Sequence, residues 1–356
     1  MDPTYPLFPI LNLIAFFLAL IPVCGVLRRS LPLTLGAFTF AVCLSLASLI
    51  QSVNLIAWKN TYENIAPIWC DISVHLEIGA GTGISVSALI MTRRLYKMIS
   101  TQAVNSGAEI KKEVVLEVLL AVGFPCFMMG LYYIIQPFRF GIIGEVGCVP
   151  TLDESWVSML IYHLWPLVIT MISTFVYCPL IGVYLCRNPQ IMREILNNRR
   201  NSAKSGSSFD QTHWIRMLFL CFSVILASLL TGITKLVDDF ATLQGMKLPF
   251  WVGWSAVHGS DWGTPFTEPD TTDASTVFRL RCGQTIYFVL ALALFLLFGV
   301  TATAKEEYRR AVWAIGSAIG VSRRGIRTTS SLPEMHFEVN PDAVKTVTSM
   351  DSTRHE

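Results

Sequence analysis

The apolar run from 68 to 92 contains the residues best able to do chemistry inside a membrane. Asp71 and His75 are four residues apart, so a helix places both on one face, and Thr82 continues that face. Ionisable groups in a transmembrane helix normally face the bundle interior or a wet cavity. We therefore expect Asp71 and His75 to line a ligand pocket, with Glu77 a weaker candidate. The alternative is that Asp71 lies so near the membrane surface that water simply solvates it.

A second group of candidates lies in three other apolar runs. Asn54 lies near the end of one run, and Gln284 near the start of another. Tyr162, His163 and Trp165 lie together in a third, where the following proline frees a main-chain carbonyl and permits a bend. We expect these side chains to contact a ligand as well. The alternatives are that the polar ones hold helices together and that the aromatic ones form an interfacial belt.

These residues do not form the pattern expected of an enzyme. Asp71, His75 and His163 are conceivable zinc ligands, but a catalytic zinc site needs about three well-placed ligands and an open position. No His-x-x-x-His or Glu-His pair supports such a site. The last apolar run, 282–304, lacks the lysine that a retinal Schiff base requires. We therefore expect no catalytic residue, no metal and no cofactor.

The candidates must be positioned by membrane-spanning helices. Of the 356 residues, 53% are hydrophobic and 15% are charged, whereas soluble domains carry about 25% charged residues. The net charge of +2 is too small to suggest a nucleic-acid partner. A helix needs about 20 apolar residues to cross a bilayer, and only helices satisfy their own backbone there. Seven runs qualify, which predicts an all-α membrane protein with a seven-transmembrane helix bundle: about 5–27, 32–58, 68–92, 114–136, 156–186, 214–237 and 282–304.

The distribution of basic residues predicts the orientation of the bundle. Of the 27 Lys and Arg residues, 21 fall on the side that carries the final segment of the chain. Positive residues stay in the cytoplasm, so we expect the N-terminus outside and the C-terminus in the cytoplasm. The first run is not a cleaved signal peptide, because Arg28 and Arg29 follow it, the reverse of a signal's polarity.

Three of the nine cysteines fall on the predicted outer side, where disulfides form. Cys70, Cys148 and Cys282 allow three pairings. We favour a Cys70–Cys148 bridge, which would tie the outer end of the third helix to the second outer loop.

Two segments outside the helices stand out. The predicted third outer loop, 238–281, is rich in Trp and Gly, and a loop of this length without regular elements is usually functional or disordered. It is predicted to hold aromatic anchors at the membrane interface or to form a lid over a ligand. We divide the chain into a seven-transmembrane domain, 1–310, and a cytoplasmic tail, 311–356. The tail is expected to begin with a short amphipathic helix and then to be disordered.

Short motifs occur in a characteristic order between about residues 5 and 310. They are Asn54 and Trp58, Trp69-Cys70-Asp71-Ile72-Ser73, Gly79 to Gly83, Arg93-Arg94-Leu95-Tyr96, Gly147-Cys148, Trp165-Pro166, Tyr177, Trp214-Ile215-Arg216-Met217, Phe298-Gly299, Ala304 and Tyr308-Arg309. This ordered set resembles the fungal mating pheromone receptors of the a-factor (lipopeptide) type. Those proteins are class D G-protein-coupled receptors whose ligands are prenylated peptides.

The resemblance implies roles for particular residues. Cys70 and Cys148 would form the outer disulfide, and the polar residues described above would meet the ligand. The basic residues expected at the G-protein face are Arg93, Arg94, Lys97, Arg187, Arg193 and Arg216. The activation switch stays unidentified, because the sequence lacks both the Asp-Arg-Tyr and the Asn-Pro-x-x-Tyr motif, and the sixth run has no proline between Met217 and Leu236.

We therefore interpret the chain as a multi-pass plasma-membrane receptor and not an enzyme. Its expected partners are a farnesylated peptide pheromone, a heterotrimeric G protein and membrane lipids, with no nucleic acid. The oligomeric state stays open, and a homodimer is allowed for. The alternative function is a seven-helix transporter of a lipid or small molecule. Transporters often show internal repeats and broken helices in matching places, and we find no repeat that relates the first three runs to the last three.

Overall fold

The computed structural model describes residues 5–27, 34–100, 107–188, 211–242, 248–269 and 274–300, together with Lys305 and Arg309. The predicted tail, 311–356, and Arg193 lie outside the described residues, so the statements about them stay predictions.

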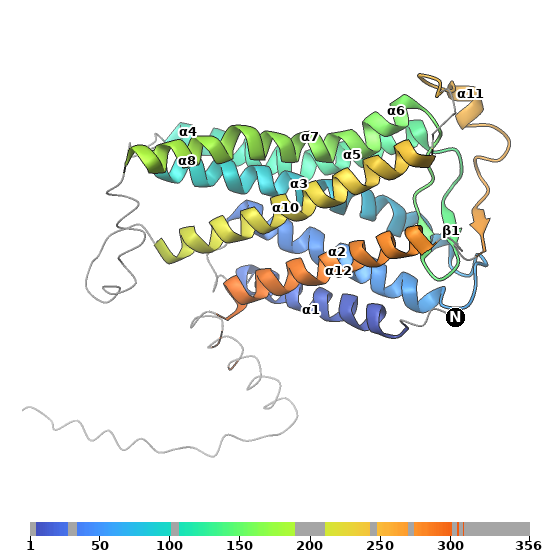
Figure 1. Ribbon diagram of the computed structural model, residues 1–356, viewed down its shortest axis with the longest axis horizontal. Helices are drawn as coiled ribbons and strands as arrows, with labels where there is room; N and C mark the ends of the chain where they lie inside the picture. The colour runs from blue at the N-terminus through green and yellow to red at the C-terminus, as the bar shows by residue number, and fades with distance from the viewer. Residues whose placement is uncertain are drawn as a thin grey trace, which may run out of the picture. The chain divides into compact units, whose positions relative to one another are not determined.

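Seven helices are long and apolar enough to cross a membrane, which confirms the predicted number of spans. They lie side by side in one bundle (Figure 1). The first three spans are α1 (Leu7–Leu27), α2 (Leu35–Ala57) and α3 (Pro67–Ser100). The sixth is α10 (Gln211–Thr242), and the seventh consists of α12 (Ala274–Leu294) and η5 (Phe295–Gly299).

The fourth and fifth spans are helices interrupted by π-helical segments. The fourth consists of α4 (Gly107–Val118), the π-helical η1 (Leu119–Gly123), α5 (Phe124–Tyr132) and a final 3₁₀ turn, η2 (Tyr133–Ile135). The fifth consists of α6 (Trp156–Ser158), η3 (Met159–Leu164), α7 (Trp165–Ile172), η4 (Ser173–Tyr177) and α8 (Cys178–Arg187). Each of η1, η3 and η4 ends just before Pro125, Pro166 or Pro179, respectively. Proline has no N–H to donate to the preceding turn, so the helix widens there.

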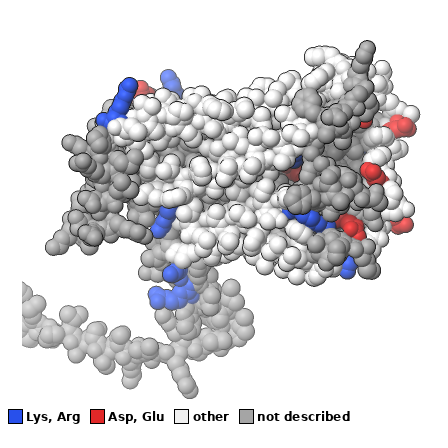
Figure 2. All heavy atoms as spheres, viewed as in Figure 1, with Lys and Arg blue, Asp and Glu red and all other residues white. Residues whose placement is uncertain are grey.

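The surface of the bundle matches a membrane environment. Large apolar side chains point outward, such as Phe175 at 69% and Phe219 at 62% exposure. The long lateral surface carries very few charged side chains in the view of Figure 2, and most of the acidic side chains in that view gather at one end. The interior holds apolar residues of several helices, among them Phe40 of α2, Met91 of α3 and Met217 of α10, all fully buried.

One end of the bundle carries a three-stranded sheet, and we call it the sheet end. Strands β1 (Gly141–Ile143) and β2 (Gly147–Val149) form an antiparallel hairpin. Strand β3 (Phe266–Glu268) pairs with β1 in parallel, so that Gly141 lies opposite Phe266. The opposite end carries Arg93, Arg94 and Lys97, and we call it the basic end.

The segment between the sixth and seventh spans differs from the prediction of a long loop without regular elements. Helix α10 continues to Thr242, and α12 begins at Ala274, which shortens the loop from both sides. The described part of the loop contains β3 and a short helix, α11 (Trp254–Val257). The sequence pattern did not reveal these elements because each spans only three or four residues.

Candidate functional site

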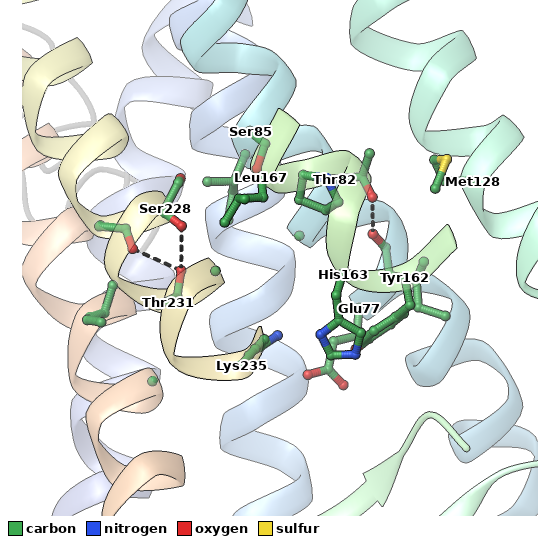
Figure 3. Close-up of a pocket in the computed structure, with 18 of the residues that line it drawn as sticks. Glu77, Thr82, Ser85, Met128, Tyr162, His163, Leu167, Ser228, Thr231 and Lys235 are labelled. Atoms are coloured by element: carbon green, nitrogen blue, oxygen red, sulfur yellow. Dashed lines mark hydrogen bonds between the residues drawn. The ribbon is translucent and has the colours of Figure 1, made fainter. Parts of the chain in front are cut away.

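A cavity of about 160 Å³ lies inside the bundle, in the half nearer the sheet end. Its walls come from α3, α5, η3, α7, α10 and α12, so five of the seven spans contribute to it (Figure 3). The lining is mainly apolar and includes a few polar side chains, one of them acidic and one basic. A concave, largely apolar site with a few polar groups is the usual form of a ligand pocket.

Two charged side chains face this cavity from different helices. Glu77 comes from α3 and Lys235 from α10. The side-chain amide of Gln51 on α2 donates a hydrogen bond to Glu77 Oε1 at 3.1 Å. Figure 3 shows the Glu77 carboxylate and the Lys235 ammonium directed toward each other, with His163 beside them. The cavity therefore has a charged region.

Aromatic side chains form the wall beside these charges. Lys235 Nζ lies 5.8 Å from the ring centre of Tyr162, and the Tyr162 and His163 rings meet edge to face at 4.7 Å. Tyr132 of α5, which also lines the cavity, donates its hydroxyl to the Thr151 carbonyl at 3.1 Å. A cation near an aromatic ring is attracted by the negative face of the ring, so Tyr162 helps to hold Lys235 in place.

Two glycines leave room in the cavity walls. A Cβ added at Gly81 of α3 or at Gly283 of α12 would meet no atom within 4 Å. By contrast, a Cβ at Gly232 of α10 would lie 2.7 Å from Leu167 Cδ1 of α7. The cavity is therefore open beside Gly81 and Gly283 and tightly closed where α10 packs on α7.

Two of the predicted ligand contacts, Tyr162 and His163, line the cavity. Asp71 and His75 do not. They line a separate and more open groove of about 720 Å³, with Tyr133 of η2 and Trp262. Arg139 Nε donates to Asp71 Oδ1 at 2.9 Å, and this hydrogen bond raises the pKa of the Arg139 guanidinium. Asp71 is thus held in a partly exposed ion pair at the sheet end.

Asn54 binds the hairpin of the sheet. Its Nδ2 donates to the Cys148 carbonyl at 3.1 Å, and its Oδ1 accepts from Trp69 Nε1 at 2.8 Å. Gly147, which has a φ of +95°, packs so closely that an added Cβ would lie 2.6 Å from Asn54 Cβ. In this structure Asn54 therefore has a structural role at the sheet end.

The remaining predicted residues have mixed surroundings. Gln284 of α12 is buried and accepts a hydrogen bond from Arg281 Nη1 at 3.0 Å. Trp165 is 40% exposed and meets the ring of Phe124 edge to face. Neither side chain lines the cavity. That Asp71, His75, Asn54, Trp165 and Gln284 contact a ligand therefore stays a prediction.

A disulfide joins Cys70 of α3 to Cys148 of β2, as predicted. Both cysteines are buried in an apolar cluster with Trp58, Phe140 and Ile142. The bond links residues 78 positions apart, so it ties the sheet to the end of a helix that lines the cavity.

Aromatic rings hold the loop between α10 and α12 against the fourth span. His258 stacks on Trp254 at 4.0 Å, and Tyr133 lies 4.8 Å from His258 and 5.5 Å from Trp262. His258 Nε2 also lies 3.1 Å from the Tyr133 carbonyl oxygen. We call these four residues the aromatic cluster. They fit either of the predicted loop roles, interfacial anchors or a lid.

At the basic end, two of the predicted coupling residues take part in ion pairs with the fourth span. Arg94 Nη1 lies 3.4 Å from Glu117 Oε2, and Lys97 pairs with Glu113. Arg93 and Arg216 are partly exposed. Arg187 is exposed at the end of α8.

The sequence-based prediction did not include Lys235, which supplies the positive charge in the cavity. Lys235, Tyr132 and Tyr287 line it but are not among the predicted residues. Glu77, the weaker candidate, lines it, whereas Asp71 does not. A signal was present, because Lys235 and Glu77 are two of the few charged residues within the predicted spans. What could not be read from spacing is that helices far apart in the sequence turn these two side chains toward the same space.

Comparison with known proteins points to one family. A family model named STE3 and described as "Pheromone A receptor" matches residues 7–316. The chain is 29% identical over 330 residues to the Pheromone B alpha 3 receptor of Schizophyllum commune, covering 91% of this chain and 50% of that protein.

Two further relatives agree with that match. Pheromone receptor 1 of Ustilago hordei is 28% identical over 280 residues, which cover 78% of this chain and 75% of that protein. The Pheromone a factor receptor of Saccharomyces cerevisiae is 24% identical over 247 residues, which cover 68% of this chain and 48% of that protein. The chain thus spans about half the length of the Schizophyllum and Saccharomyces relatives.

Proposed function

The chain belongs to the STE3 family of pheromone A receptors, and we propose that it binds a farnesylated peptide pheromone and activates a heterotrimeric G protein. It is a multi-pass membrane protein, and we place it in the plasma membrane. The sheet end would face outward and the basic end the cytoplasm, in keeping with the excess of Lys and Arg predicted on the inner side.

The observation that supports this function most is the cavity between α3 and α10. It lies within the membrane-spanning part of the bundle, is lined mainly by apolar side chains and contains Glu77 and Lys235. Its volume of about 160 Å³ is below the range of roughly 300–1,000 Å³ typical of small-molecule pockets. We therefore propose that it receives only part of the pheromone.

The farnesyl group would concentrate the ligand at the membrane before binding. Each buried CH₂ contributes about 0.8 kcal/mol to membrane partitioning, so the prenyl chain enters the outer leaflet first. The peptide part would then reach the cavity and the groove lined by Asp71 and His75. We also propose that the ligand contacts Asn54, Trp165 and Gln284, which lie outside the cavity.

Activation would change the basic end, where the G protein binds. A ligand shifts a conformational equilibrium only by its difference in affinity for the two states. We propose that in the bound state the G protein contacts the basic residues Arg93, Arg94, Lys97, Arg187, Arg193 and Arg216. We also propose that the chain divides into a membrane domain, 1–310, and a tail, 311–356. A homodimer is compatible with this proposal.

Transport of a lipid or small molecule is not favoured. The matched family model describes receptors, and the relatives' names are those of pheromone receptors.

The test expresses the chain in fungal cells that lack their own pheromone receptor and carry a G-protein-driven reporter. We expect at least one peptide of a farnesylated panel to activate the reporter and its unprenylated counterpart to be much weaker. Silence to the whole panel, together with substrate flux in vesicles that contain the protein, would support the transporter instead.

A cavity-filling variant tests where the ligand lies. Gly81→Leu adds bulk to open space in the cavity, so we expect the half-maximal peptide concentration to rise by roughly tenfold or more. Gly130→Leu is the matched control, because a Cβ at Gly130 also meets no atom within 4 Å but Gly130 is exposed outside the cavity. If the two variants respond equally at equal surface amounts, the ligand does not bind in the cavity.

A further inference from the structure

Two charges inside the bundle need an explanation, because an ionised side chain at membrane depth is costly and normally marks function. Glu77 lies in the third span and Lys235 near the end of the sixth, and both line the cavity. They come from helices that are separated by two further spans in the sequence.

The described residues give each charge an incomplete set of partners. Among the described residues, Gln51 donates the one hydrogen bond to Glu77, and it reaches a single carboxylate oxygen, Oε1. Lys235 lies beside the Tyr162 ring but makes no ion pair within 4.0 Å with a described carboxylate. More than a third of the Lys235 residue surface is exposed. Oxygen Oε2 of Glu77 and the ammonium of Lys235 therefore retain hydrogen-bonding capacity toward the cavity.

The two groups also have complementary chemistry. A carboxylate only accepts hydrogen bonds, and an ammonium only donates them. They face each other across the cavity (Figure 3), so a simple cation would be repelled by Lys235 and a simple anion by Glu77. The group that satisfies both is neutral overall, with a donor and an acceptor a short distance apart. The main-chain amide of a peptide has this form.

We infer that Glu77 and Lys235 form a charge clamp that binds a main-chain amide of the ligand peptide. Glu77 accepts the amide N–H, and Lys235 donates to a neighbouring carbonyl oxygen. The inference rests on the proposed function, since it takes the ligand to be a peptide. It assigns recognition of the ligand's peptide part to Glu77 and Lys235, independently of the prenyl chain.

The clamp also explains why the surrounding contacts are placed as they are. Gln51 holds one oxygen of Glu77 by a hydrogen bond, and Glu77 lines the cavity. Tyr162 lies 5.8 Å from Lys235 Nζ on the side of the fifth span, and an aromatic ring attracts the ammonium without neutralising it. Both charged groups are thus held in position while each retains capacity for a ligand.

The first test measures reporter activation by a farnesylated peptide in single-charge variants. Hydrogen bonds to charged groups contribute enough that Glu77→Gln and Lys235→Met should each raise the half-maximal concentration roughly tenfold to hundredfold. The matched controls are Glu63→Gln and Lys59→Met, which remove the same charges at the sheet end, outside the cavity. Surface amounts are measured in parallel. Unchanged potency in both cavity variants would overturn the clamp.

The second test needs no peptide and decides the geometry directly. The thiol of the Lys235→Cys variant is reacted with cationic and anionic methanethiosulfonate reagents, above the background of the unsubstituted chain. Each rate is divided by the rate of the same reagent with a small free thiol. Because Glu77 faces this position, we expect the normalised rate of the cationic reagent to be roughly tenfold higher than that of the anionic reagent. In the Glu77→Gln background the two normalised rates should become equal. The ratio of two reagents cancels any effect of Glu77 on the thiol itself.

The outcomes separate the two proposals. If no farnesylated peptide activates the wild-type chain but the reagent preference is present, the proposal of a farnesylated peptide ligand is wrong. The placement of Glu77 opposite Lys235 is then still supported. If peptides activate the chain but the reagent preference is absent, the receptor function stands and the clamp is wrong.

Discussion

The two ends of the bundle are held together by different means. At the sheet end, a disulfide, three paired strands and the aromatic cluster connect the third, fourth and fifth spans and the loop after the sixth. At the basic end, the described connections between α3 and the fourth span include the ion pairs of Arg94 with Glu117 and of Lys97 with Glu113. Their side chains are 12–40% exposed.

This difference indicates where the bundle can change shape at little cost. Removing a native disulfide typically costs about 2–5 kcal/mol, whereas a surface ion pair contributes about 0–1 kcal/mol. The cavity lies nearer the firmly connected end. A ligand bound there would therefore meet a fixed frame, and rearrangement would appear mainly at the basic end.

The largest expected effect comes from breaking the covalent link at the sheet end. Cys148→Ser should lower the free energy of unfolding by about 2–5 kcal/mol and sharply reduce the amount of protein at the cell surface. Cys282→Ser is the control, because Cys282 is an exposed free cysteine. Surface labelling and thermal unfolding in detergent measure both. Normal stability of the Cys148 variant would contradict the assignment of the sheet end as the firm one.

A smaller effect is expected from disturbing the packing of the hairpin. Gly147→Ala combines a positive φ with a Cβ that would lie 2.6 Å from Asn54, so we expect a loss of about 2–4 kcal/mol. Gly253→Ala has a similar φ of +92° but open space around the new Cβ, so its loss should be about 1–2 kcal/mol. Thermal unfolding compares them. Equal losses would mean that the contact with Asn54 adds nothing.

The smallest effect is expected at the basic end, on signalling and not on stability. Glu117→Gln and Glu113→Gln each remove an ion pair worth up to about 1 kcal/mol, so ligand-free reporter activity should rise by up to roughly fivefold. Asp71→Asn removes the ion pair with Arg139 at the sheet end and should leave ligand-free activity unchanged. A rise for Asp71→Asn alone would reverse the comparison between the ends.

The sequence predicted the spans well because membrane thickness dictates their length. The predicted run 214–237 coincides with the apolar part of α10, and 156–186 differs by one residue from the fifth span. The sheet was missed for a physical reason. Its strands have three residues each, too few to show alternation, and β1 pairs with a strand more than a hundred positions later in the chain.

The candidate site was only partly predictable from spacing. Asp71 and His75 do lie near one another on α3, but that face borders the groove, whereas Glu77, two residues beyond His75, lines the cavity. In a span with polar residues on several faces, periodicity groups residues by face without saying which face looks inward. The rotation of α3 is fixed by its contacts, such as Gly83 against Cys43 of α2 and Cys70 in the disulfide.

The most direct test of the account measures two distances between α3 and α10 by paired spin labels, with and without an activating farnesylated peptide. One pair replaces the exposed residues Met98 and Phe219 near the basic end, and the other replaces the exposed residues Ile72 and Val237 near the sheet end. We predict that the peptide changes the 98–219 distance and leaves the 72–237 distance unchanged. A change confined to the 72–237 pair would contradict a signal received in the cavity and delivered at the basic end.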